Sequence, residues 1–315
     1  MTTALKGLTG SIMESTLVPG SPEWLRAGVS SSRIAAIIGK SYFSSYFETW
    51  HIMAGNLAYD GTTESQVQRR GRLLEPSVVA WFAEEHPEFD VLPTGTWVAE
   101  GAPRHFSSPD RLAVHRDTGE VALVEAKTAI VDDEYGPGGS DQVPPPYFVQ
   151  SQWHLYCTGA QTCYLPVLKA YLDFELYVIH RDDVFIQSLA TAADDFLATL
   201  PGEPGYRLPP IEGSDATYQA IRKLTPGIEE GDVIIDPELA SVYLQALHDV
   251  EESEKALRYA KSAIADKLGP FKSAVTPVRV GDAVEHRKVA YRKNARGGPT
   301  LVKANKLPEI ASLAG

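Results

Sequence analysis

The stretch from Ser107 to Lys127 (SSPDRLAVHRDTGEVALVEAK) constrains the fold more than any other part of the chain. A strand that enters at residues 105–106 is followed by turn-forming residues at 117–120 and then by a second apolar segment, so the pattern predicts a β-hairpin. Fourteen residues separate Asp110 from Glu125, and a hairpin of this length brings the start of one strand beside the end of the next. The two carboxylates are therefore expected to lie side by side.

The charged residues of this hairpin point to a metal or to an ion pair. Pro109 favours extended backbone before it and places Asp110 at a strand edge, whereas Glu125 and Lys127 are two apart and share one face of a strand. Two acids and a lysine among apolar residues cost free energy unless they are compensated. A hard cation such as Mg²⁺ compensates them, because carboxylate oxygens bind it and otherwise repel one another. A salt-bridged sheet edge is the alternative, and so short a motif does not decide between them.

Composition bounds the class of protein. The 315 residues, 43% of them hydrophobic, suffice for one large domain or for a domain with an appendage. Two cysteines are too few for a disulfide framework or a four-cysteine metal site. We find no apolar run of membrane-spanning length and no signal peptide at the N-terminus, so we expect a cytoplasmic protein. The net charge of −12 argues against a broad basic surface for polyanions, although an enzyme can confine positive charge to a channel.

The beginning of the chain contains a candidate anion site. Residues 1–22 are small and polar, and we expect a loosely held lead-in. The serines at 30–32 precede an apolar run that ends at Gly39, which predicts a short helix. Together with Arg26, the start of that helix offers donors to an anion. The alternative is that the serines only cap the helix and that Arg26 only pairs with an acid.

Periodicity predicts the elements around the hairpin. They are, in order, helices over 44–54 and 68–85, a strand over 91–99, a helix over 147–158, strands over 163–168 and 172–180, and a helix over 181–200. Within the second helix, Glu75 lies near the apolar stripe, either as an exposed boundary residue or aimed inward at a cation. Tyr147 and Gln150 are three apart and share a helix face. The Gly- and Pro-rich residues 132–146 predict a loop that contacts substrate.

The C-terminal third has a different character. The Pro- and Gly-rich residues 201–205 mark a boundary, so we expect a lead-in over 1–22, a core over 23–205 and an extension over 206–315. A long helix starts at Pro237 and carries a narrow apolar seam interrupted by Glu254 and Lys261, a pattern suited to packing along one partner surface. The basic tail that follows predicts a β-hairpin, either a phosphate-binding patch or a solvated surface.

Taken in order, these segments resemble a known family. The motifs WLRAGVSSSRIAAIIG, SSYFETW, GRLLEP, SSPDRL, LVEAKT and PYFVQSQWHLYCTG, spread over residues 23–200, resemble the YqaJ-type viral recombinases, the phage lambda exonuclease family within the PD-(D/E)XK nucleases. The resemblance implies an α/β fold, with a restriction-endonuclease-like mixed central sheet flanked by helices. A long helix and a β-hairpin form its C-terminal extension.

The resemblance also implies roles for the residues of the hairpin and of the helix before it. Asp110 and Glu125 would bind Mg²⁺, or Mn²⁺ in its place, with the carbonyl of Ala126 as a third ligand. Lys127 would orient the attacking water or offset developing charge. Glu75 would serve a second metal ion or its water.

The remaining implied roles concern the substrate. Gln150 would hold Lys127 or the water, with Tyr147 close by, and Arg26 and Ser32 would bind a terminal 5′-phosphate. The implied activity is 5′ to 3′ digestion of linear double-stranded DNA by a ring-shaped homo-oligomer, leaving a 3′ overhang for a single-strand annealing protein. A restriction-like or repair endonuclease with the same metal site is one alternative. A non-catalytic binding module on a nuclease fold is another, which the presence of the whole residue set disfavours.

Overall fold

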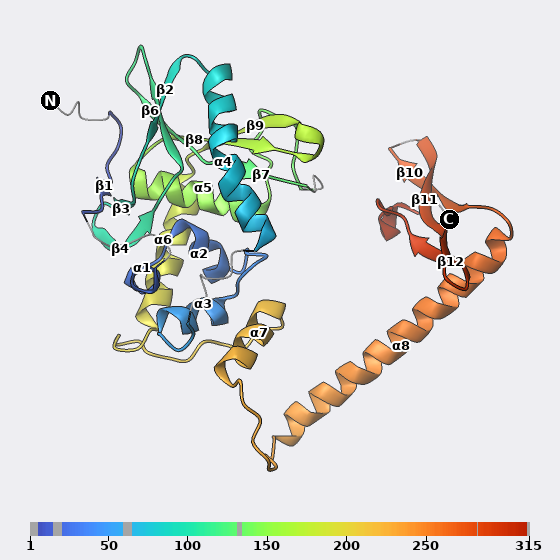
Figure 1. Cartoon of the computed structure of the whole chain (residues 1–315). Coiled ribbons are helices and arrows are strands. Elements are labelled where there is room, and N and C mark those ends of the chain that lie inside the picture. Colours follow the sequence, from blue (N-terminus) through green and yellow to red (C-terminus); the bar gives the residue numbers. More distant parts are fainter. Residues whose placement is uncertain (1–5, 15–20, 59–64, 131–133, 282, 314–315) are drawn as a thin grey trace. The chain divides into compact units, whose positions relative to one another are not determined.

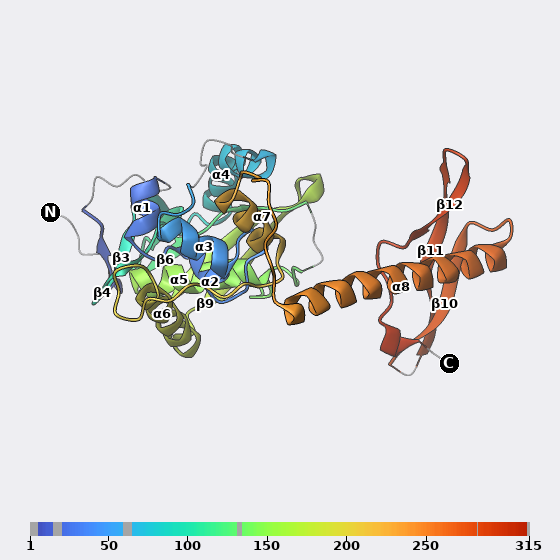
Figure 2. The same ribbon diagram turned by 90° about the horizontal axis from the view of Figure 1, so that it is seen from below.

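The structure is a computed structural model that describes residues 6–14, 21–58, 65–130, 134–281 and 283–313. The chain divides into two compact units, Met1–Ile228 and Glu229–Gly315 (Figures 1 and 2). The parts of the predicted lead-in at 1–5 and 15–20, and residues 132–133 of the predicted loop, lie outside the described residues. No helix in the described part is both long and apolar enough to cross a bilayer.

The first unit contains helices on both sides of a central sheet. Its helices are α1 (Pro22–Ala27), α2 (Ser31–Ile37), α3 (Tyr46–Met53), α4 (Gln66–Glu85), α5 (Pro145–Thr158), α6 (Asp183–Ala198) and α7 (Asp215–Leu224). Its strands are β1 (Ser11–Ile12), β2 (Phe89–Pro93), β3 (Trp97–Ala99), β4 (Ala102–Ser107), β5 (Arg111–His115), β6 (Val121–Val124), β7 (Lys127–Thr128), β8 (Thr162–Leu168) and β9 (Phe174–His180). A short 3₁₀ turn, Ala170–Leu172, joins the last two strands.

The central sheet is mixed, and this confirms the predicted fold class. Its strand order is β2-β5-β6-β8-β7, with β9 paired to β8. β5 and β6 form the antiparallel hairpin that the sequence predicts, and Arg111 pairs with Val124. β6 and β7 both run parallel to β8. Because the hairpin register sets Arg111 opposite Val124, the residues just before β5 and just after β6 lie together at the open end of the hairpin, away from its turn.

Alternation along the hairpin strands fills two cores, one on each face of the sheet. Leu112 and Leu123 belong to the largest apolar cluster, which includes Trp153 of α5. Their neighbours Ala113 and Val124 point to the other face and pack in a cluster with Phe82 of α4. Successive strand residues point to opposite faces, so α5 and α4 cover opposite faces of the same two strands.

Two strand predictions are wrong in their extent. The expected strand over 91–99 is two strands in different sheets, because Pro93 and Gly95 interrupt the ladder: β2 joins the central sheet and β3 joins a second sheet of order β1-β3-β4. The strand at 105–106 belongs to β4 of that second sheet and ends before Pro109. The lead-in is also held more firmly than expected, since Thr9 and Gly10 donate from their backbone N–H groups to Thr158 O at 3.0 and 3.1 Å.

The link between α1 and α2 is tied to β4 by its backbone. Val29 donates to Arg104 O at 2.8 Å, and Phe106 donates back to Val29 O at 3.1 Å. A Cβ added at Gly28 would lie only 2.0 Å from Arg104 O, so no other residue fits without moving the backbone. This close approach fixes where α1 and α2 leave the sheet.

The first unit extends beyond the predicted boundary at 201–205. The sequence pattern did not predict α7, which packs on α3 through Ala220 in a cluster with Phe47 and Leu57. Thr217 Oγ1 also donates to Ser45 Oγ, the N-cap of α3, at 2.8 Å. Whether the functional core itself ends at residue 205 stays a prediction.

The second unit consists of one helix and one sheet. Its elements are α8 (Pro237–Leu268), β10 (Ser273–Val280), β11 (Ala283–Ala295), β12 (Gly298–Lys303) and a 3₁₀ turn (Ile310–Ser312). The helix begins where Asp236 caps the N–H of Glu238 at 2.7 Å and ends at Gly269. The predicted hairpin is confirmed in β10 and β11, and β12 adds a third antiparallel strand.

Candidate active site

The hairpin register brings the two predicted acids together. Asp110 immediately precedes β5, and Glu125 immediately follows β6. Asp110 Oδ2 accepts a hydrogen bond from the backbone N–H of Ala126 at 2.8 Å. The backbone N–H of Glu125 donates to Tyr164 O on β8 at 2.9 Å, which fixes the second acid against the neighbouring strand. The expectation that the carboxylates lie side by side is confirmed.

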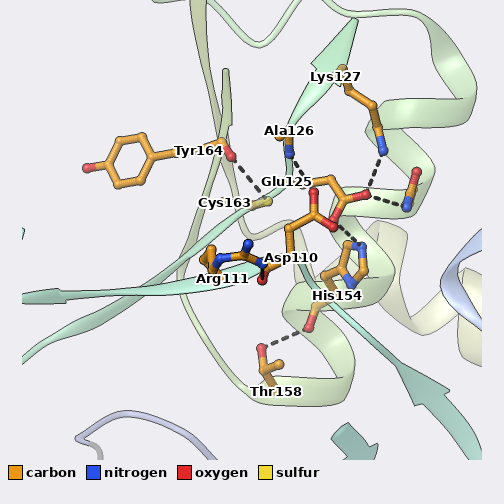
Figure 3. A network of polar contacts seen from close by, with 10 residues as sticks. Asp110, Arg111, Glu125, Ala126, Lys127, His154, Thr158, Cys163 and Tyr164 are labelled. Carbon is orange, nitrogen blue, oxygen red and sulfur yellow. Dashed lines mark hydrogen bonds and ion pairs between the residues drawn. The ribbon is translucent and has the colours of Figure 1, made fainter. Parts of the chain in front are cut away.

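Glu125 is the centre of a buried polar network (Figure 3). Its side chain is 5% exposed, and Oε1 accepts from Lys127 Nζ at 2.5 Å and from Gln150 Nε2 at 2.7 Å. Its other oxygen, Oε2, lies 3.2 Å from Nε2 of the fully buried His154. That contact is an ion pair when the histidine is protonated, and Oε2 has no other polar partner among the described residues. One oxygen of this acid is thus held by two donors, and the other contacts His154.

The two acids differ in their electrostatics. Burial raises the pKa of the Asp110 carboxyl well above its usual range, and the charge of Glu125 raises it further. Burial also acts to raise the pKa of Glu125, but Lys127 and His154 outweigh burial and hold that pKa below its usual range. Burial acts to lower the pKa of Lys127, yet the two acids raise it overall, so the lysine keeps its proton. An ionised Asp110 beside ionised Glu125 is therefore costly unless a further cation is present.

Glu75 reaches the same region from α4 but pairs with an arginine. Its Oε1 lies 3.2 Å from Arg111 Nη1, and that guanidinium nitrogen also donates to Asp110 O at 2.5 Å. Glu75 also contributes to the raised pKa of Asp110, which places it within electrostatic range of the first acid. The described structure thus shows Glu75 beside the acid pair, with an arginine as its direct partner.

One face of α5 supplies the partners of Glu125 and Lys127. Lys127 Nζ lies 5.3 Å from the centre of the Tyr147 ring, within the range of a cation–π contact. Gln150 and His154 are four residues apart and meet the two oxygens of Glu125. Helical spacing predicts Tyr147 and Gln150 on this face, and His154, four residues after Gln150, is a further member that the spacing also indicates.

A cavity of about 790 Å³ opens at the acid pair. Its lining includes six of the predicted residues, namely Ser32, Glu75, Asp110, Glu125, Lys127 and Tyr147, and also the backbone-ligand candidate Ala126. Two basic residues outside the predicted set, Arg33 and Lys223, line it as well. The cavity is large enough for a nucleotide-sized group, and it contains both acids and bases.

The predicted anion site is brought together only in part. Ser32 lines the cavity and lies 3.2 Å from Ser30, oxygen to oxygen. Arg26 is not among the lining residues, and its guanidinium lies 3.9 Å from Glu23 and donates to Pro22 O at 3.2 Å. The buried Arg33 lines the cavity instead and donates to Leu25 O. The role of Arg26 and Ser32 in phosphate binding stays a prediction.

The acid pair fits a divalent cation in its chemistry. Among the described residues, no three histidine, cysteine, aspartate or glutamate side chains gather closely enough to hold a metal ion. The oxygens that do gather are those of Asp110 and Glu125, and Ala126, whose N–H donates to Asp110 Oδ2, lines the same cavity. These are oxygen donors of the kind that Mg²⁺ and Mn²⁺ take, and Mg²⁺ usually binds one or two carboxylates and keeps several waters. The assignment of Glu75 as a further ligand stays a prediction.

One family model matches the part of the chain that contains this site. Residues 23–161 match the model of the YqaJ-like viral recombinase domain. This span contains Asp110, Glu125 and Lys127, together with the α5 face that contacts them. No curated protein matches the chain.

Three solved structures show limited likeness. An alkaline exonuclease from Laribacter hongkongensis is 22% identical, with a TM-score of 0.41 over 56% of this chain and 91% of that chain. A phage-related exonuclease from Haemophilus somnus 129PT is 12% identical, with a TM-score of 0.38 over 56% and 96%. A protein named SSO0001 is 12% identical, with a TM-score of 0.35 over 60% and 82%. Since these TM-scores lie below 0.5, the likenesses carry no argument about activity.

Proposed function

We propose that this chain, whose residues 23–161 match the YqaJ-like viral recombinase domain, is a magnesium-dependent exonuclease that degrades the 5′-ended strand of linear duplex DNA. One observation carries the proposal. Asp110 and Glu125 lie side by side at a cavity, with the ammonium group of Lys127 at 2.5 Å from Glu125 Oε1. Two oxygen donors and a nearby cationic side chain are the groups that metal-assisted phosphodiester hydrolysis needs.

Each residue has a distinct task in this reaction. Asp110 and Glu125 would hold the cation, with Ala126 between them. The bound metal ion lowers the pKa of a water and offsets charge on the scissile phosphate. Lys127 keeps its proton, so it acts as a positive charge toward the phosphate and not as a base. Gln150 fixes the Glu125 oxygen that Lys127 also contacts.

The direction of digestion rests on recognition of a DNA end. Ser32 lines the cavity, and Arg26 lies in the preceding helix, so both are candidates to contact a 5′-phosphate. Arg26→Ala should selectively slow digestion of phosphorylated ends and leave digestion of unphosphorylated ends unchanged. An endonuclease would show no such dependence, because internal cleavage requires no terminal phosphate.

The proposed product is a duplex with a 3′ single-stranded overhang. Such a product suits a single-strand annealing protein, and the recombinase name of the family supports this partner. A ring-shaped homo-oligomer around the DNA is part of the same proposal and rests on the family resemblance. Processive digestion of one strand would favour an enclosing assembly of this kind.

End-labelled duplexes provide the test. Duplexes labelled at one 5′ or one 3′ terminus, with and without a 5′-phosphate, should lose the 5′ label as mononucleotide at early times only when Mg²⁺ is present. Asp110→Asn should reduce the rate by about 10³-fold or more, because it removes a metal ligand without changing side-chain size. The control is Asp90→Asn, an exposed acid that pairs with Arg116 on the surface.

Two outcomes would overturn the proposal. Release of the 3′ label first would contradict the polarity, and internal fragments would favour an endonuclease. Hydrolysis that persists at the same rate in the Asp110→Asn protein would remove the acid pair from the chemistry.

A further inference from the structure

Helix α8 carries a long apolar seam that the rest of the second unit leaves uncovered. Its large seam residues are half or more exposed: Tyr243 (63%), Leu247 (50%), Val250 (58%) and Leu257 (55%). Their spacings are four, three and seven, which is the a/d pattern of a coiled coil with Glu254 at the intervening position. Among the helix residues that are described, only Leu268 is buried. A 32-residue helix with such a seam gains free energy by burying it against another helix.

The distribution of charge along α8 indicates that this partner helix is a second copy of α8. Between residues 237 and 254 the helix carries five carboxylates and no lysine or arginine. Between residues 255 and 268 it carries four basic residues and one acid. Two copies in antiparallel orientation would therefore set the acidic half of each helix along the basic half of the other. Two parallel copies would align like charges along their whole length.

One acid and one base interrupt the seam, and they also favour the antiparallel orientation. Glu254 and Lys261 occupy successive a positions, and in a parallel pair each would face its own copy. In an antiparallel pair with its two-fold axis between residues 255 and 256, Leu247 packs against Ile264 of the second copy. Glu254 then lies one helical turn from Lys261 of the second copy. The same register sets Glu251 beside Arg258 of the second copy.

We propose that α8 is a self-association site, and that two copies of this chain pair through an antiparallel α8 coiled coil. The ligand of the exposed seam is thus a second copy of the same helix. The small residues Ala246, Ser253 and Ala260 lie along one flank of the seam, which permits close approach of the two backbones. The pairing is independent of the nuclease chemistry, because it uses no residue of the cavity.

Charge reversal in the full-length chain tests the pairing. Sedimentation equilibrium of the wild-type protein should give twice the mass of Glu254→Lys, and the reversal should raise the dissociation constant at least about tenfold, because it creates two like-charge contacts by symmetry. Lys261→Glu should behave in the same way. The double variant Glu254→Lys with Lys261→Glu, and an equimolar mixture of the two single variants, should regain the wild-type mass.

A control variant outside the seam and two cysteine variants test the orientation of the pair. Glu252→Lys makes the same charge change and breaks an equivalent pair, since Glu252 lies 3.5 Å from Lys255 and Glu254 lies 3.4 Å from Arg258. It should leave the mass unchanged. Under mild oxidation, Leu247→Cys chains should cross-link with Ile264→Cys chains and not with themselves.

Three results would overturn the proposal. They are a wild-type mass that Glu254→Lys does not alter, a double variant that stays dissociated, and cross-linking of Leu247→Cys chains to one another. The last result would show a parallel pair. If the seam instead packs on the first unit of the same chain, or on another protein, Glu254→Lys will leave the wild-type mass unaltered.

Discussion

His154 shows how much of the site depends on groups behind the acids. It is fully buried, and its Nε2 lies 3.2 Å from Glu125 Oε2, the oxygen that Lys127 and Gln150 do not contact. With Lys127 it keeps the pKa of Glu125 low, so Glu125 stays ionised and able to bind a cation. The histidine does not line the cavity. It is therefore a positioning residue for the acid.

We expect His154→Gln to weaken divalent-cation binding and lower kcat by about 10- to 100-fold, with little change in KM for DNA, because partners of metal ligands have effects of this size. Calorimetric titration with Mn²⁺ and steady-state digestion together measure the effect. His180→Gln is the control, since His180 lies at an exposed strand end near Thr162. An unchanged Mn²⁺ affinity with normal folding would remove His154 from the site.

The sequence alone was sufficient for the residues whose relation depends on hairpin register. Asp110 and Glu125 could be predicted as neighbours because the turn at 117–120 fixes the register of the hairpin. That register sets the residue before the first strand beside the residue after the second strand. The contacts of Glu75 with Arg111 could not be predicted in this way. They depend on how α4 crosses the sheet, and helix crossing angles are set by packing over the whole interface.

At the scale of elements, the junction between α1 and β4 depends on one glycine. The approach of Gly28 to Arg104 O leaves no room for a Cβ. We expect Gly28→Ala to lower the free energy of unfolding by about 1–3 kcal/mol, the usual cost of overpacking. Urea denaturation measures the change. Gly71→Ala in α4 is the control, because a Cβ there meets nothing within 4 Å, and it should leave stability unchanged or raise it by roughly 0.5–1 kcal/mol.

Helix α7 adds a basic residue to the cavity from outside the span that matches the family. Lys223 lines the cavity, and its Nζ lies 3.9 Å from Glu48 Oε1. We expect Lys223→Ala to weaken DNA binding several-fold and to reduce the salt dependence of binding by about one unit of slope, as for a single phosphate contact. Its neighbour Arg222, which contacts Gln219, provides the control. Equal salt slopes for Lys223→Ala and wild type would show that α7 makes no phosphate contact.

Local pattern did not predict α7, and the reason is physical. With ten residues, α7 is shorter than the window over which a helical period is usually read, although Ala220, Ile221 and Leu224 share one face. The helix is fixed instead by tertiary contacts with α3 that involve Phe47 and Ser45. In contrast, α8 could be predicted because Pro237 and Gly269 mark its ends.

At the scale of the whole molecule, the net charge of −12 conceals a local excess of positive charge. Residues 269–313 contain nine lysines and arginines against three acids. The register sets Tyr291 opposite Ser273 and, across a bulge, Lys288 opposite Val275, so Lys288 and Lys293 lie on one face of the second unit's sheet. An acidic chain thus keeps a basic surface suited to phosphate.

We expect the double change Lys288→Glu with Lys293→Glu to weaken binding of long duplex DNA by about tenfold at low salt, because two phosphate contacts are lost. The rate on saturating substrate should not change. Fluorescence anisotropy across a salt series measures the binding. Lys255→Glu with Lys267→Glu on α8 changes the charge equally, and a similar loss in that protein would mean that net charge alone sets affinity.

Diffraction from crystals soaked in Mn²⁺, with an anomalous difference map, tests the central claim most directly. The proposed site requires a peak about 2.0–2.4 Å from carboxylate oxygens of both Asp110 and Glu125. The Asp110→Asn protein should lose that peak. A map with no peak at these two acids under saturating Mn²⁺, or with peaks only elsewhere, would contradict the assignment of the hairpin as the metal-binding centre of a nuclease.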